Sequence, residues 1–114
     1  MPEMKTAEVT QTKLPAQPTL AELQTFIAAL VARRGWTTDA NEIFTLFTEE
    51  VGEVAKEIRR TWKDGVDPHR AALGAELADV LFYVADLANV HGIDLAAAVA
   101  DKAAFNETRA DFGA

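Results

Sequence analysis

The chain has 114 residues, 49% of them hydrophobic, and its 18 acidic and 11 basic residues give a formal net charge of −7. This length fits one small domain, and the charge disfavours binding to a nucleic-acid polymer, although it permits a single nucleotide held through metal ions. The sequence has no cysteine, which excludes a disulfide framework and a thiolate metal site, and no apolar run long enough to cross a membrane. We therefore expect a cytoplasmic protein.

Residues 1–18 contain three prolines and no sustained hydrophobic period, which predicts a flexible tail ahead of a helical domain at residues 19–114. Thr19 and Glu22 have capping-box spacing, and apolar residues then recur on one face. A first helix is predicted from Leu20 to Arg34.

Gly35 ends this helix, and Asp39 repeats the cap pattern before a second helix predicted from Ala40 to Trp62. Acidic side chains lie along one edge of this helix, and we expect Glu57 there, like Asp86 in the next helix, to form surface ion pairs. The predicted core stripe of the second helix consists of Ile43, Phe44, Phe47, Val51, Val54 and Ile58.

Asp67 followed by proline predicts the N-terminus of a third helix that runs from Pro68 to His91. Asp94 caps a fourth, predicted from Leu95 to Arg109. No strand-like alternation is present, so the fold class is all-α, a four-helix bundle. Because four amphipathic helices of this length make a thin bundle with surplus apolar surface, we expect a homodimer or homotetramer.

Two acidic pairs are the main chemical signal. Glu50 with Glu53, and Glu76 with Asp79, are each three residues apart, so each pair shares one helical face. Carboxylates that flank a core need a cation, and oxygen ligands without Cys or His suit Mg²⁺ or Mn²⁺ and argue against Zn²⁺. A solvated acidic face is the alternative for either pair alone.

The order of motifs resembles the MazG-like, all-α nucleoside triphosphate pyrophosphohydrolases, which include the dimeric dUTPases and dCTP pyrophosphatases. The likeness spans about Leu20 to Arg109. It rests on GluGluValGlyGluVal, GluLeuAlaAspValLeuPheTyr, HisGlyIleAsp and a closing Lys102xxxAsn106xxArg109. The resemblance implies that Glu50, Glu53, Glu76 and Asp79 bind Mg²⁺, with Mn²⁺ as a substitute, and that Glu49 is a further ligand or the base that deprotonates water.

The resemblance also implies a set of substrate-binding residues. Lysine, asparagine and arginine on the last helix would contact phosphate or sugar, and aromatic residues would contact sugar or base. Surface exposure for the polar residues, and core or subunit contact for the aromatic ones, are the alternatives. The set is Lys102, Asn106, Arg109, Tyr83, Trp36 and Trp62.

The function expected from this resemblance is Mg²⁺-dependent hydrolysis of a nucleoside or deoxynucleoside triphosphate between its α and β phosphates, for nucleotide-pool sanitation. The alternative is a non-catalytic acidic helical module that binds a partner or a metal. A di-iron bundle is disfavoured because no histidine stands three residues after a glutamate. The base and the sugar stay open.

Overall fold

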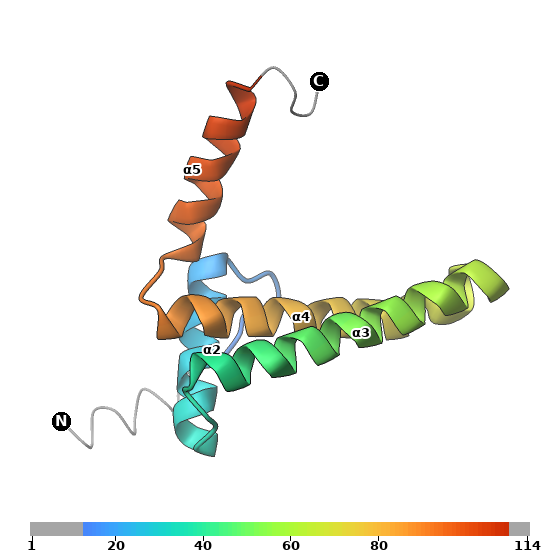
Figure 1. Ribbon diagram of the computed structural model, residues 1–114, viewed down its shortest axis with the longest axis horizontal. Coiled ribbons are helices and arrows are strands. Elements are labelled where there is room, and N and C mark those ends of the chain that lie inside the picture. Colours follow the sequence, from blue (N-terminus) through green and yellow to red (C-terminus); the bar gives the residue numbers. More distant parts are fainter. Residues whose placement is uncertain (1–12, 110–114) are drawn as a thin grey trace.

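The computed structural model describes residues 13–109, which form four α-helices and a short 3₁₀ turn and contain no strand (Figure 1). The all-α fold class is therefore confirmed. None of the helices in this range is both long and apolar enough to span a membrane. The elements are α2 (Leu20–Arg34), α3 (Ala40–Asp64), η1 (Asp67–His69), α4 (Arg70–Val90) and α5 (Leu95–Glu107).

Side-chain caps set most of the helix starts. The Thr19 hydroxyl accepts a hydrogen bond from the Glu22 amide at 3.1 Å, and the Glu22 carboxylate accepts one from the Thr19 amide at 2.8 Å, which completes a capping box. Gly35 ends α2 with φ of 64°, where a residue with a Cβ would be strained. Asp39 and Asp94 cap α3 and α5 through their carboxylates.

The predicted start of the third helix is wrong in detail. Asp67 does not cap α4; it lies in η1 and pairs with Arg70 at 2.9 Å, and α4 begins only at Arg70, without a side-chain cap. The fixed φ of Pro68 suits the tight 3₁₀ turn equally well, so the Asp-Pro pair begins η1 instead. α3 is two residues longer than predicted and α5 is two residues shorter.

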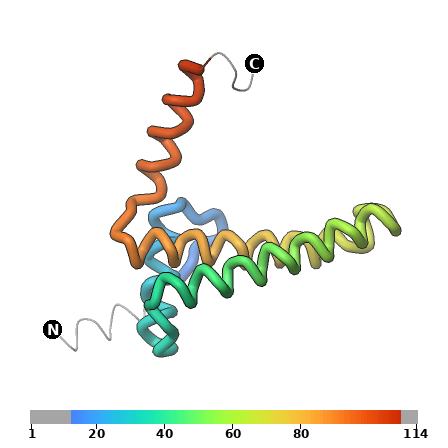
Figure 2. Tube along the Cα trace, in the orientation of Figure 1, coloured from blue at the N-terminus to red at the C-terminus, as the bar shows by residue number. Residues whose placement is uncertain are grey.

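The helices form an open shape. α3 and α4 pack against each other as an antiparallel arm, α2 crosses the base of this arm, and α5 points away from it (Figures 1 and 2). The radius of gyration is 16.9 Å, whereas a compact chain of about this length has roughly 13 Å. A single chain therefore leaves much of its helix surface uncovered.

The core lies where α2 crosses α4. Leu23, Ile27 and Val31 of α2 and Ala85 of α4 are buried together, and Leu14 packs against them from the segment before α2. Residues 1–12 of the predicted tail lie outside the described range.

The predicted core stripe of the second helix is wrong for half of its members. Ile43 is only 1% exposed, but Phe44, Val51 and Ile58 are exposed by 55%, 45% and 47%. The reason is that α3 packs mainly against α4, while α2 packs against α4 and leaves much of the α3 surface uncovered.

A polar network fixes the start of α5. The Gln24 side chain donates to the Asn89 carboxamide at 3.0 Å and to the Ile93 carbonyl at 2.8 Å, and it accepts from the Leu95 amide at 2.9 Å. The Asn89 side chain donates back to the Gln24 carbonyl at 2.9 Å. These bonds tie α2, α4 and the first residue of α5 together, and they set the direction in which α5 leaves.

Candidate active site

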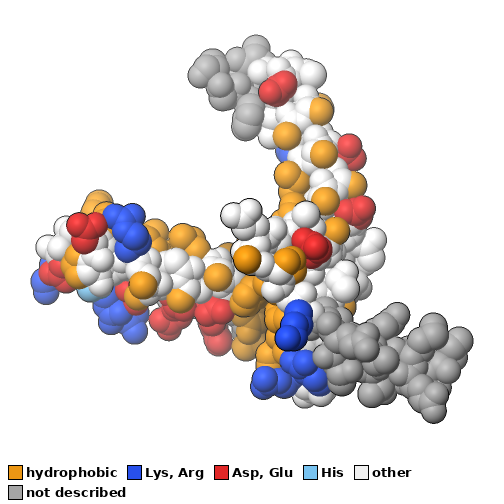
Figure 3. Space-filling view, turned by 180° about the vertical axis from the view of Figure 1, so that it is seen from behind, with side chains coloured by type: hydrophobic (Ala, Val, Ile, Leu, Met, Phe, Trp, Pro, Cys, Tyr) orange, Lys and Arg blue, Asp and Glu red, His pale blue; other side chains and the backbone are white. Residues whose placement is uncertain are grey.

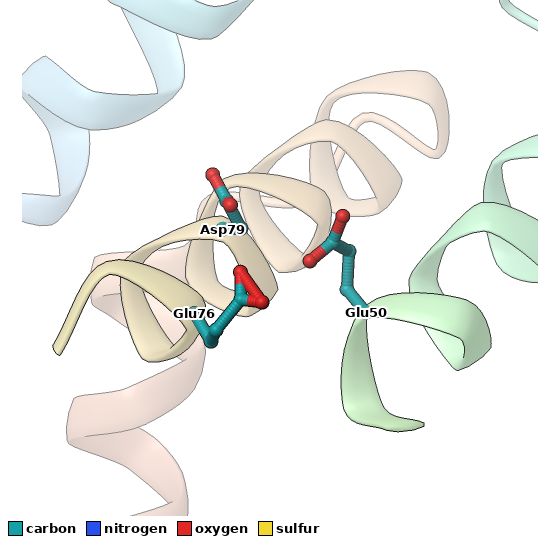
Figure 4. A group of neighbouring side chains, drawn as sticks. All are labelled: Glu50, Glu76 and Asp79. Atoms are coloured by element: carbon teal, nitrogen blue, oxygen red, sulfur yellow. The ribbon is translucent and has the colours of Figure 1, made fainter. Parts of the chain in front are cut away.

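Three carboxylates converge between the helices of the arm. Glu50 of α3 and Glu76 and Asp79 of α4 each present one oxygen, and these three oxygens lie within 4.8 Å of one another (Figure 4). All three side chains are half-buried. Since Glu76 and Asp79 are three residues apart, both point to the side of α4 that α3 covers. The packing of two antiparallel helices therefore builds a cluster of oxygen donors from residues far apart in the sequence.

The cluster is electrostatically unfavourable without a cation. Desolvation raises the pKa of Glu50, and the negative charges of Asp79 and Glu76 raise it further. Desolvation likewise raises the pKa of Glu76, with Glu53 and Asp79 as the next causes. One Glu50 oxygen, Oε2, is buried and has no hydrogen-bond partner in the part of the chain described. A divalent cation would satisfy this oxygen and offset the repulsion among the three acids, so the donor set fits such an ion.

The other acids of α3 lie around this cluster. Glu53 is not one of the three converging residues; its side chain is half-exposed and lies 3.9 Å from the Lys56 ammonium. Its charge still reaches Glu76, whose pKa it helps to raise. Glu49 is exposed at the surface beside Glu50.

An apolar cavity of about 530 Å³ opens next to the carboxylates. Glu50 and Asp79 belong to its wall, so the cavity and the candidate metal site are continuous. The remaining wall comes from α2, α3, α4 and the α2–α3 connection: Ile27, Leu30, Val31, Trp36, Thr37, Ile43, Leu46, Phe82, Tyr83 and Asp86. A mostly apolar pocket with a few polar groups at one end is the common form of a small-molecule site.

Two of the predicted aromatic residues reach this cavity and one does not. Trp36 and Tyr83 line it, and burial followed by the charges of Glu50 and Asp79 raises the pKa of the Tyr83 hydroxyl, which therefore stays protonated and can donate. Trp62 is 88% exposed near the end of α3, beside Lys56 and Arg59.

The predicted phosphate-binding residues of the last helix lie apart from the carboxylates in this chain. The ammonium of Lys102 lies over the Phe105 ring at 4.9 Å, and Asn106 borders a separate shallow depression on α5. Arg109 follows the end of α5, where its amide donates to the Asn106 carbonyl. Because α5 points away from the arm, these three residues are not brought to the cluster (Figure 1).

Two buried acids differ from the surface ion pairs that the sequence predicts. Glu57 does pair with Arg60 at 2.6 Å, but it is only 7% exposed, and its second oxygen has no partner within residues 13–109. Asp86 is 9% exposed and forms no ion pair with any described residue. Sequence spacing alone gives no signal for either one, because helical periodicity does not show how far a neighbouring helix extends.

The sequence matches known proteins. The model of the MazG nucleotide pyrophosphohydrolase domain matches residues 39–110, which include both acidic pairs. The dCTP pyrophosphatase 1 proteins of Rattus norvegicus and Homo sapiens are each 33% identical over 103 residues, covering 82% of this chain and 59% of the relative. The Bos taurus protein is 32% identical over 104 residues, with 82% and 60% covered.

The chain therefore spans about three fifths of the length of the curated relatives that it matches. The family match covers most of the chain and contains α5 as well as α3 and α4, the two helices that carry the carboxylate cluster. Together with the all-α fold, this match shows that the chain belongs to the MazG nucleotide pyrophosphohydrolase domain family.

Proposed function

We propose that this protein hydrolyses a nucleoside or deoxynucleoside triphosphate between its α and β phosphates, giving a nucleoside monophosphate and pyrophosphate. The observation that carries this proposal is the convergence of three carboxylate oxygens within 4.8 Å at the edge of an apolar cavity. Such an arrangement can hold the charged end of a nucleotide through a metal ion and its base in the cavity.

The metal that we propose is Mg²⁺, with Mn²⁺ as a substitute, because the donors are all carboxylate oxygens. Glu50, Glu76 and Asp79 would hold it, and Glu53 would join them by leaving Lys56, whose exposed ion pair is weak. When bound, Mg²⁺ supplies a Lewis acid that offsets negative charge on the phosphate oxygens.

The other side chains position the substrate and move a proton. Glu49, exposed beside the cluster, is the candidate to accept a proton from the attacking water. Trp36 offers an aromatic face to the base, and the protonated Tyr83 hydroxyl offers a donor to the sugar. The apolar wall excludes bulk water, which strengthens each of these polar contacts.

We also propose that the active site is completed in a homodimer or homotetramer. In one chain, Lys102 and Asn106 lie on α5 away from the carboxylates, although their charge and amide suit phosphate oxygens. Asn106 has a buried side-chain oxygen without a partner among residues 13–109. A neighbouring subunit that packs on the exposed apolar face of the arm could supply α5 to the cluster.

The substrate class follows the relatives. They are named dCTP pyrophosphatases, so a cytosine deoxynucleotide is the first substrate to test, and sanitation of the nucleotide pool is the role that we propose. A cytoplasmic location is part of the same proposal, because free nucleotides are found there.

The test is pyrophosphate release from the common and several modified triphosphates at fixed Mg²⁺. We expect turnover that requires the metal and disappears in Asp79→Asn. A matched variant, Asp67→Asn, changes an exposed aspartate in η1 far along the arm and should keep full activity. If Mn²⁺ bound to the protein but no triphosphate were hydrolysed, the alternative of a non-catalytic metal-binding module would be favoured instead.

A further inference from the structure

Asp86 is a buried acid in the wall of the cavity. It is 9% exposed, it lies among residues such as Ile27, Val31 and Phe82, and its carboxylate has no hydrogen bond or ion pair with a described residue. Burial raises its pKa. A carboxylate in an apolar wall is unfavourable when it is charged and has no partner, so a ligand that pairs with it in the cavity would be favoured.

Its position relative to the carboxylate cluster matches the far end of a nucleotide. Asp86 follows Asp79 by seven residues on α4, which returns it to nearly the same helix face and places it about 10 Å further along the axis. Tyr83 lies between the two, and all three residues line the same cavity. A substrate with its phosphates at Asp79 therefore extends its sugar past Tyr83 and its base toward Asp86.

We propose that Asp86 is a specificity-determining residue that pairs with the exocyclic amino group of the nucleobase and selects amino bases over their keto counterparts. This inference rests on the proposed function. Aspartate is an acceptor for the amino group of cytosine, and the amino group of adenine is a donor of the same kind. In uracil and hypoxanthine a carbonyl oxygen takes this position, and two acceptors then face each other in an apolar site.

The preference depends on the ionised form of Asp86, because a carboxylate accepts hydrogen bonds and donates none. A neutral carboxyl group pairs with both kinds of base. It donates to the ring nitrogen and accepts from the amino group in cytosine or adenine, and it donates to the keto oxygen and accepts from the ring N–H in uracil or hypoxanthine.

The experiment compares two substrate pairs that differ only at this group, dCTP with dUTP and dATP with dITP. For each we measure kcat/KM and, with analogues that cannot be hydrolysed between the α and β phosphates, Kd in the presence of Mg²⁺. The wild type should prefer the amino member by on the order of 10- to 100-fold. Asp86→Asn presents an amide that can donate to a carbonyl, so it should lose or reverse this preference.

Asp86→Ala removes the hydrogen-bonding group altogether, so the ratio of kcat/KM between the amino and keto members of each pair should be near one. The matched control Asp67→Asn should keep the wild-type ratio, and circular dichroism should show that all variants keep their helices. The inference would be overturned if the wild type used the amino and keto members of each pair equally well. A preference for the amino member that survives in both Asp86 variants would overturn it too.

The two proposals fail in different ways. Amino-selective binding that depends on Asp86, without release of pyrophosphate from any triphosphate, would overturn the proposed hydrolysis and leave base selection standing. Hydrolysis without any Asp86-dependent preference would leave the proposed hydrolysis standing and overturn base selection by Asp86. A wild type that binds none of the four analogues would overturn both.

Discussion

Glu50 on α3 and Asp79 on α4 come within 4.8 Å of each other through carboxylate oxygens, and both also belong to the wall of the apolar cavity. The two residues thus connect the candidate metal site with the space in which a base can lie. We expect Glu50→Gln and Asp79→Asn each to lower kcat by on the order of 100-fold or more, because each removes a ligand charge at nearly constant volume. Steady-state kinetics at saturating Mg²⁺ and Mn²⁺ titration would measure this.

The helical content of these two variants should not change, and their metal-free forms should melt at or above the temperature of the wild type, since one repelling charge is gone. Glu53→Gln should also lose most activity if Glu53 joins the metal. Normal turnover and full metal occupancy in all three variants would show that these residues do not form the metal site.

The pH dependence of stability follows from three raised pKa values, those of Glu50, Glu76 and Asp86. Between the ordinary values of 4.5 and 3.8 and the raised values, the folded state binds more protons than the unfolded state. The free energy of unfolding of the metal-free protein should therefore fall as the pH rises through this window. Urea unfolding in EDTA between pH 5 and pH 8 would show it.

Mg²⁺ should weaken this pH dependence, because it binds the deprotonated carboxylates and stabilises the folded state at the upper end of the range. Glu50→Gln should flatten the EDTA curve, whereas Asp67→Asn should not. A metal-free curve that rises steadily from pH 5 to pH 8 would contradict the expected direction.

The helix bounds show which local features sequence can predict. Thr19, Gly35 and Asp94 act at the predicted positions because a cap depends on a few neighbouring residues. The start of α4 was missed because Asp67 followed by Pro68 suits a 3₁₀ turn as well as an α-helix. Such a choice depends on how the chain leaves α3, which the local pattern does not contain.

The candidate site also has features that the sequence predicts and features that it does not. The convergence of Glu50, Glu76 and Asp79 agrees with the spacing of the acidic pairs, because each pair lies on one face of one helix. The buried position of Asp86 was missed, since it depends on α2 crossing the base of the arm. The direction of α5, which decides where Lys102 lies, depends on the bonds that the Gln24 side chain makes.

The Gln24 network predicts a stability effect. Asn89→Ala removes a reciprocal pair of side-chain bonds between α2 and α4 and leaves the Gln24 side-chain amide without one of its two acceptors. We expect a loss of about 1–3 kcal/mol in the free energy of unfolding, measured by urea denaturation. Asn41→Ala, an exposed change near the start of α3, is the control and should cost much less. Equal losses in the two variants would show that the Gln24 network stabilises the fold no more than an exposed side chain does.

Lys102→Ala should raise KM while leaving Mn²⁺ titration unchanged. The ammonium of Lys102 is not a metal ligand, and a phosphate contact affects substrate binding more than metal binding. Asp101→Asn, an exposed neighbour on the same helix, is the matched control. If Lys102→Ala instead lost metal binding and kept the KM of the wild type, the proposed placement of α5 beside the substrate phosphates would be wrong.

The face of the arm that one chain leaves uncovered predicts self-association. Val51 of α3 and Leu77 and Leu81 of α4 are exposed by 45%, 51% and 43%, and Figure 3 shows hydrophobic side chains continuing along the arm on the face seen from behind. Burying about 800 Å² per subunit would form an ordinary stable interface. We expect light scattering at micromolar concentration to give a multiple of the 12.4 kDa chain mass.

Leu81→Lys places a charge on this face and should shift the protein toward the monomer. Ala28→Lys introduces the same charge at an exposed position of α2, outside the arm, and should leave the oligomer intact. If α5 completes the site of a neighbouring subunit, the Leu81→Lys monomer should also lose activity, although it keeps its own carboxylate cluster. A wild-type monomer with full activity would rule out completion of the site by a second subunit.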